Sequence, residues 1–106
     1  MISDVEPNAD VAAELMRLAD GHGRLLWHHS KQWASANLAG SRDELCLEYI
    51  GAEAMAAGTA LADQLAELPF RLAGRIVADA TLGFNRRLQK PMPRFVAVFE
   101  LLLVKD

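Results

Sequence analysis

The chain has 106 residues, of which 52% are apolar and 24% are charged, and its formal net charge is −3. This length and composition favour a single folded domain over residues 1–106 and exclude the low-hydrophobicity, high-charge pattern of disordered chains. The acidic balance argues against a broadly basic nucleic-acid-binding surface, although it is compatible with a local basic patch.

Cysteine usage and the apolar runs bear on the cellular compartment. Cys46 is the only cysteine, so it cannot form an intramolecular disulfide, and a reducing cytoplasm fits best. Residues 1–10 contain three acids and no basic residue, unlike the positively charged start of a secretory signal. No uninterrupted apolar run approaches the ~20 residues of a membrane-spanning helix. We therefore expect a cytoplasmic protein that does not contact membranes.

The first predicted element is a helix that follows a loosely ordered segment, residues 1–8. Asn8 or Asp10 is a good N-cap, and the Gly-His-Gly turn after Asp20 ends the helix. Its apolar stripe at helical spacing comprises Val11, Leu15, Leu18 and Ala19.

Strand-like sequence follows this helix. Residues 24–27 and 33–38 have strand character, and residues 39–43 predict a turn-rich connection to a strand over residues 44–50. In that last strand alternation separates an apolar face (Leu45, Leu47 and Tyr49) from a second face (Glu44, Cys46 and Glu48). We predict a hairpin with one buried face.

The second predicted helix covers residues 52–68 and ends before Pro69. It is rich in alanine, the residue with the best helix propensity. Gly58 lowers helix stability by ~1 kcal/mol relative to alanine, so it either marks close packing on the sheet or is merely tolerated.

Two further strands are predicted in the second half, over residues 70–84 and 95–104. Residues 85–94 connect them, because Pro91 and Pro93 cannot pair regularly in a central strand. The order α-β-β-α-β-β predicts an α+β domain, a four-stranded antiparallel sheet with helices packed on one face.

Two short internal sequence similarities, or echoes, leave open whether the two αββ units arose by duplication. Residues 18–20 resemble residues 61–63, and residues 34–38 resemble residues 78–82, at offsets of 43 and 44. Such alanine-rich matches also arise by chance.

The adjacent histidines His28 and His29 are the first candidates for metal binding. Neighbouring strand residues point to opposite faces, so the two rings should not converge on one ion. The chain also lacks HExxH and paired CxxC motifs, so we expect no metal and no cofactor. A pocket containing His28, His29 or Tyr49 would instead indicate a small-ligand site.

No catalytic residue is predicted. A Cys46 thiolate would be disfavoured by Glu44 and Glu48, which share its face and should raise the pKa of its thiol. The acid pair Asp43 and Glu44 lies beside a predicted turn, where solvation is the simplest expectation. Serine-hydrolase and phosphate-loop motifs are absent.

Trp27 and Trp33 have two possible roles. They could stack on a ring or a nucleic-acid base, but tryptophans of a small sheet more often supply core area. We therefore expect both in the core.

The most unusual segment is residues 85–94, which carries four positive charges and no acid: Arg86, Arg87, Lys90 and Arg94. A basic hairpin can contact phosphate, nucleic acid or an acidic protein. It can equally keep the hairpin tip solvated and protect the neighbouring edge from aggregation. We favour the solvated tip, with an acidic partner next and nucleic acid last.

The last strand predicts self-association. One face carries Val96, Val98, Leu102 and Val104 with Glu100 as its only charge, and the opposite face is apolar as well. Helices on one side leave the second face uncovered, so a second copy of the chain should cover it unless the sheet curls over itself.

Taken together, these features favour a non-enzymatic domain that acts by protein contact, as a homodimer or a component of a larger assembly. Two alternatives remain open from the sequence. One is a ligand binder or enzyme with its pocket between helix and sheet or between subunits. The other is a nucleic-acid accessory protein that uses the basic hairpin over residues 85–94.

Overall fold

The computed structural model describes residues 9–106, and it confirms the α+β class and the order α-β-β-α-β-β. Predictions for residues 1–8, including the Asn8 cap, lie outside the described residues. The elements are α1 (Ala9–Leu18), β1 (Arg24–Ala34), β2 (Ala39–Ile50), α2 (Ala52–Asp63), the short 3-10 turn η1 (Leu65–Glu67), β3 (Arg75–Leu88) and β4 (Arg94–Lys105). Within residues 9–106 no helix is long and apolar enough to cross a membrane.

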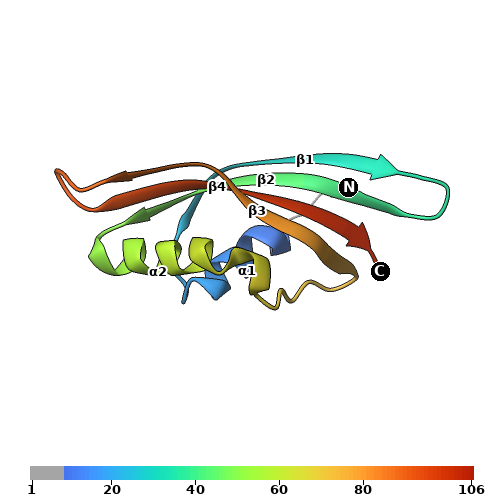
Figure 1. Ribbon diagram of the computed structural model, residues 1–106, viewed down its shortest axis with the longest axis horizontal. Coiled ribbons are helices and arrows are strands. Elements are labelled where there is room, and N and C mark those ends of the chain that lie inside the picture. The colour runs from blue at the N-terminus through green and yellow to red at the C-terminus, as the bar shows by residue number, and fades with distance from the viewer. Residues whose placement is uncertain (1–8) are drawn as a thin grey trace.

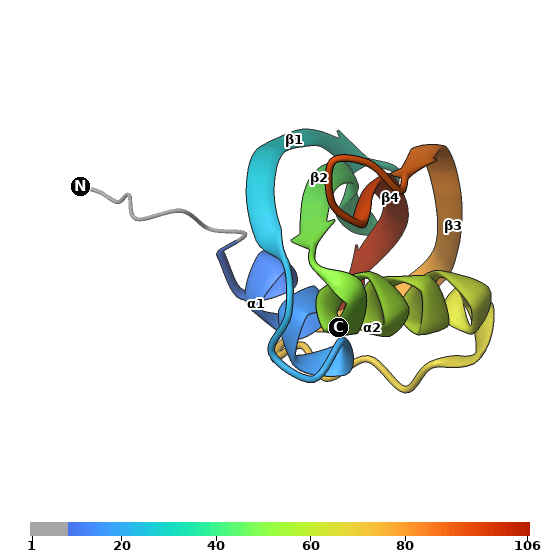
Figure 2. The ribbon, with the colours of Figure 1, turned by 90° about the vertical axis from the view of Figure 1, so that its left-hand side faces the viewer.

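The four strands form one antiparallel sheet in the order β1-β2-β4-β3. Each hairpin contributes one central strand, so the two hairpins join where β2 pairs with β4. Both helices lie on the same face of this sheet (Figures 1 and 2). We call the face toward the helices the inner face and the opposite one the outer face.

The core lies between the inner face and the two helices. Alternation along β2 and β4 places their large apolar side chains there, where α1 and α2 cover them. The largest fully buried apolar side chains are Tyr49, Phe95, Phe99, Leu15, Leu45, Leu47 and Leu103.

Tyr49 explains the glycine within α2. A Cβ added to Gly58 would lie 2.6 Å from the Tyr49 ring, so the helix approaches the sheet only because this position has no side chain. Gly23, with φ +115°, borders the same ring, and Phe95 stacks on it with ring centroids 5.9 Å apart. Gly58 therefore marks close packing, as one of the two interpretations of the sequence held.

A buried carboxylate ties α1 to the segment before β3. Glu14 accepts two hydrogen bonds from the Arg17 guanidinium, at 2.8 and 2.7 Å, and one from the backbone N–H of Arg71 at 2.6 Å. The Arg17 bond lowers the pKa of Glu14, burial opposes this, and the Arg71 N–H lowers it further. Arg75 of β3 also pairs with Asp10 at the start of α1.

The first hairpin differs from the prediction. Strand β1 runs unbroken over Arg24–Ala34, and the predicted connection, residues 39–43, belongs to β2. The turn is residues 35–38, closed by Ser35: its N–H donates to the Leu38 carbonyl (2.7 Å), and its hydroxyl accepts from the Leu38 N–H (3.2 Å). The prediction divided this strand because strands are recognised by apolar residues at alternate positions, whereas this edge strand contains many polar residues.

The second half needs similar corrections. Strand β3 starts later than predicted and continues to Leu88, pairing with Arg94, so the connection shrinks to residues 89–93. The two prolines prevent pairing only at their own positions, not in the residues before them. Helix α2 ends at Asp63, ahead of the predicted Leu68, and η1 leads to Pro69.

The two echoes in the sequence have different places in the fold. Residues 18–20 and 61–63 both lie at helix ends, which are equivalent positions of the two αββ units. Residues 34–38 lie at the end of β1 and in its turn, whereas residues 78–82 lie inside β3. The second echo therefore does not match equivalent positions.

Candidate functional site

The outer face is ordered into rows, because residues directly opposite each other in neighbouring strands share a face. Strand register therefore assigns the outward side chains of paired residues to rows that run across the strands, apart from the irregular positions of β1 and β3. Four successive rows are the Trp27 row (Trp27, Cys46 and Val98), the glutamate row (His29, Glu44, Glu100 and Thr81), the arginine row (Lys31, Arg42, Leu102 and Asp79) and the Trp33 row (Trp33, Gly40, Val104 and Ile76).

Apolar side chains are accessible on this face. Ile76 is 53% exposed and Trp27 is 38% exposed, although both belong to a folded sheet. Of the four predicted interface residues, Val98 is buried by its neighbours, while the other three remain half-buried: Val96, Leu102 and Val104. The outer face thus carries apolar side chains that the rest of the chain covers only in part.

The tryptophans are not where the sequence analysis expected them. Trp27 lies on the outer face, with its ring 4.9 Å from that of His29, and Trp33 lies on the same face over Gly40. The prediction that both belong to the core was wrong. That prediction rested on the tendency of large aromatic side chains to be buried under the helices. Alternation along β1 instead places both tryptophans on the outer face.

Between the two tryptophan-containing rows, the outer face has a polar hollow of about 500 Å³. The glutamate and arginine rows line it. Glu44 lies directly opposite Glu100, which is an unfavourable like-charge pair. Thr81 donates a weak hydrogen bond of 3.5 Å to Glu100, and in residues 9–106 no cation is bonded to either glutamate.

At one end of the outer face a buried glutamate is neutralised by arginines. Both Nε and a terminal nitrogen of Arg94 contact one oxygen of Glu48, at 2.7 and 2.6 Å, and Arg24 lies 3.4 Å from the other oxygen. Burial raises the pKa of the neighbouring Cys46 thiol, Glu48 raises it further, and Arg94 opposes them. The expected direction of the Cys46 pKa is confirmed, but its largest cause is burial, and of the two expected glutamates Glu48 alone contributes; the raised pKa disfavours a reactive thiolate at neutral pH.

The four basic residues of the second hairpin do not form one patch. Arg86 lies on the outer face, whereas Arg87 lies on the inner face with its guanidinium carbon 4.5 Å from the centroid of the Phe95 ring. Lys90 is exposed in the turn, and Arg94 is already paired with Glu48. A single anion-binding cluster of all four is therefore not formed.

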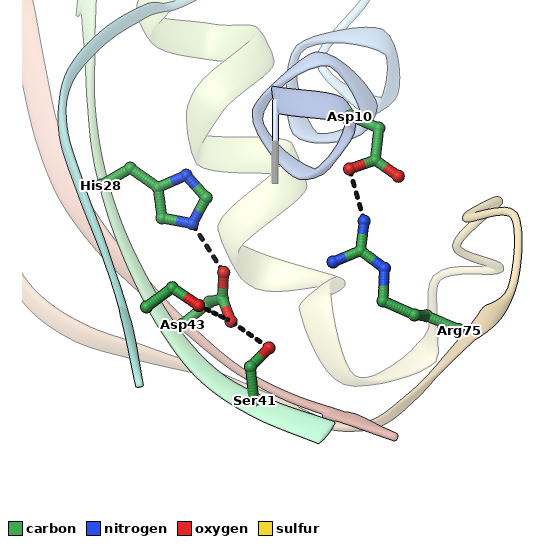
Figure 3. A network of polar contacts seen from close by, with 6 residues as sticks. Asp10, His28, Ser41, Asp43 and Arg75 are labelled. Atoms are coloured by element: carbon green, nitrogen blue, oxygen red, sulfur yellow. Dashed lines mark hydrogen bonds and ion pairs between the residues drawn. The ribbon is translucent and has the colours of Figure 1, made fainter. Parts of the chain in front are cut away.

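The inner face holds a polar network at the end of the sheet near α1 (Figure 3). Buried Asp43 accepts hydrogen bonds from His28 Nε2 at 2.6 Å, from the Ser41 hydroxyl at 2.5 Å and from the Ser30 hydroxyl at 3.1 Å. Burial alone would raise the pKa of Asp43, but the bonds from His28, Ser41 and Ser30 outweigh it and lower the pKa. The expectation that Asp43 is solvated was wrong.

This network contains serine, histidine and aspartate, but not in the order that activates a nucleophile. In a catalytic triad the histidine bridges serine and aspartate, whereas here both serines donate directly to the carboxylate. The imidazole of His28 is oriented by Asp43 and has no serine to deprotonate. The arrangement satisfies a buried charge, which is a structural role.

The predicted pocket residues do not converge. His28 faces inward and His29 outward, as alternation required, while Tyr49 lies near the other end of β2. Of these three only His29 lines the hollow on the outer face. Residues 9–106 contain no group of three or more His, Cys, Asp and Glu side chains that could hold a metal ion.

Sequence reasoning missed the residues that define both polar regions. Arg42 and Asp43 fall within the predicted turn-rich connection, residues 39–43, where alternation does not assign side chains to faces. Side chains alternate between the two faces of a strand. Because Leu45 points inward, alternation continued toward the start of β2 places Asp43 inward and Arg42 outward. The comparisons with known proteins add no guide: no family model, no curated protein and no solved structure matches this chain.

Proposed function

We propose that this chain is a non-enzymatic domain that acts by protein contact, as a homodimer formed through the outer face of its sheet. The observation that supports this most is the exposure of apolar residues there. Ile76 is accessible next to half-buried Val104, with half-buried Leu102 in the adjacent row, and Trp27 is accessible on the other side of the two polar rows. An antiparallel sheet covered by helices on one side ordinarily has a polar second face, and an exposed apolar patch marks a contact site.

The energetics favour a contact between whole sheet faces. A large apolar side chain contributes roughly 1.5–3 kcal/mol when it leaves water, while association costs about 4–15 kcal/mol. Several such side chains must therefore be buried together. The two tryptophan-containing rows provide them on one surface, and symmetric homodimers are the commonest soluble oligomers.

Light scattering of the purified full chain at tens of micromolar tests the proposal, since the monomer mass is 11.6 kDa. We expect a dimer that Ile76→Glu or Leu102→Glu converts to monomer with the circular dichroism spectrum retained. The matched control is Met92→Glu, because Met92 is 50% exposed, close to the 53% of Ile76, but lies in the β3–β4 turn. A monomeric wild-type protein, or a dimer that both outer-face variants leave intact, contradicts the proposal.

A further inference from the structure

We propose that the two copies are related by a two-fold axis that runs across the four strands, between the glutamate row and the arginine row. This inference rests on the proposed function and specifies its geometry. Each strand then faces the same strand of the second copy, running in the opposite direction. As a result the glutamate row of one copy faces the arginine row of the other, and the Trp27 row faces the Trp33 row.

The order of the rows supports this axis. Along the strands the character of the outer face is apolar, polar, polar, apolar, from the Trp27 row to the Trp33 row. A two-fold axis through the middle of this pattern places apolar rows on apolar rows and the two polar rows on each other, with Leu102, the one apolar member of the arginine row, opposite Glu100 of the second copy. Trp27 then meets Trp33, and Val98 meets Val104, of the second copy.

The uncompensated charges support it independently. Glu44 and Glu100 lie directly opposite each other, and within residues 9–106 no ion pair neutralises either of them. Arg42, two residues from Glu44 on the same strand, is exposed and has no ion pair in the described part of the chain either. The axis brings Arg42 of the second copy to face Glu44, beside Glu100.

The contact is reciprocal, so the same pair forms twice. Each copy donates one Arg42 and receives the other, and the guanidinium fork suits two neighbouring carboxylates. On β3 the Thr81 hydroxyl faces Asp79 of the second copy and donates its one hydrogen there in place of its weak 3.5 Å bond to Glu100. The residues of both pairs line the hollow of about 500 Å³, which gives the long side chains of Arg42 and Glu44 room.

A two-fold axis parallel to the strands would also stack the two outer faces, but its charge pattern is unfavourable. Each row would then face itself in reverse, so Glu44 would oppose Glu100 of the second copy. Arg24 and Arg86, which lie at the two ends of one row, would oppose each other as well. Like charges placed together oppose association, so the axis across the strands is preferred.

A charge swap tests the arrangement in the full chain by sedimentation equilibrium at low and high salt. We expect Arg42→Glu alone and Glu44→Arg alone each to weaken the dimer about tenfold or more at low salt, because each places like charges across the axis. The double variant restores the opposite-charge pair and should return the dissociation constant to within about threefold of wild type. Glu53→Arg, an exposed reversal at the start of α2, is the control and should change it less than about twofold.

The outcomes separate this inference from the proposed function. If the wild-type dimer exists and Ile76→Glu disrupts it, but the double variant is no tighter than the single ones, the axis is wrong and the contact through the outer face stands. If the wild-type chain is a monomer, both are refuted. Melting curves of all four variants verify folding, since Arg42, Glu44 and Glu53 are exposed.

Discussion

Asp43 and Glu44 are neighbours in β2, yet the sheet treats their carboxylates in opposite ways. Asp43 points inward, is fully buried and accepts hydrogen bonds from three side chains. Glu44 points outward, is exposed and lies opposite a second glutamate. The inner face thus satisfies the Asp43 carboxylate within the chain, whereas on the outer face Glu44, Glu100 and Arg42 form no ion pair within residues 9–106. The difference supports the proposal that the outer face makes the contact between copies.

The most severe test of this contrast removes each carboxylate in turn. Asp43→Ala should lower the free energy of unfolding by about 3–5 kcal/mol, because His28 and two serine hydroxyls lose a buried partner. Glu44→Ala, one residue away, should change it by no more than about 0.5 kcal/mol. Urea denaturation followed by circular dichroism measures both. Equal effects of the two substitutions would remove the distinction between the faces.

Close packing on the inner face gives the next largest effect. Gly58→Ala should destabilise the domain by about 1–3 kcal/mol, because the added methyl group would lie 2.6 Å from the Tyr49 ring. The sign is informative, since alanine is otherwise better than glycine in a helix by ~1 kcal/mol. Thermal unfolding of Gly58→Ala beside Ala56→Gly, an exposed position of the same helix, separates the two contributions. An increase in stability for Gly58→Ala contradicts the packing argument.

The pH dependence of stability should also come from the inner side of the sheet. The pKa values of Asp43 and Glu14 are lowered in the folded chain, mainly through bonds from His28 and Arg17. A lowered folded pKa stabilises the fold above the unfolded pKa, about 3.9 for Asp and 4.3 for Glu, and this contribution is lost as pH falls through the folded pKa.

Urea denaturation in steps from pH 7 to pH 3 measures that loss. Asp43→Asn should flatten the curve in the acid range, whereas Glu44→Gln should leave its shape close to that of wild type. If Asp43→Asn loses stability on acidification as steeply as wild type does, the network is not a source of the pH dependence.

The fold was largely readable from the sequence because its core obeys simple periodicities. The apolar alternation of Leu45, Leu47 and Tyr49 and the helical stripe around Leu15 are the patterns that burial requires. These patterns predict the order of the helices and strands and the packing of the helices on one face of the sheet. Strand β1 was divided in the prediction, because an edge strand beyond the helices carries polar residues such as Ser30 on its inner face.

The candidate site was less accessible to sequence reasoning, since it depends on register across four strands. The outward direction of Val96 and Leu102 follows from alternation within β4, and it was predicted. That Arg42 lies beside the Glu44–Glu100 pair requires knowing that β2 extends to Ala39 and pairs with β4. Pairing partners 56 residues apart leave no local signal in a single sequence.

The smallest expected effect, that of Glu44→Gln, has a sign that depends on protein concentration. In the monomer the substitution removes a like-charge pair with Glu100 and should raise the free energy of unfolding by no more than about 0.5 kcal/mol. In the proposed dimer it removes the partner of Arg42, so at concentrations where the dimer dominates the gain should shrink or reverse. Urea denaturation at about 1 and about 100 µM, compared with wild type at each, measures both regimes. A matched Asp43→Asn variant should be destabilised at both concentrations, because its partners lie within one chain. A Glu44→Gln effect of one sign and size at every concentration would place Glu44 outside any contact between copies.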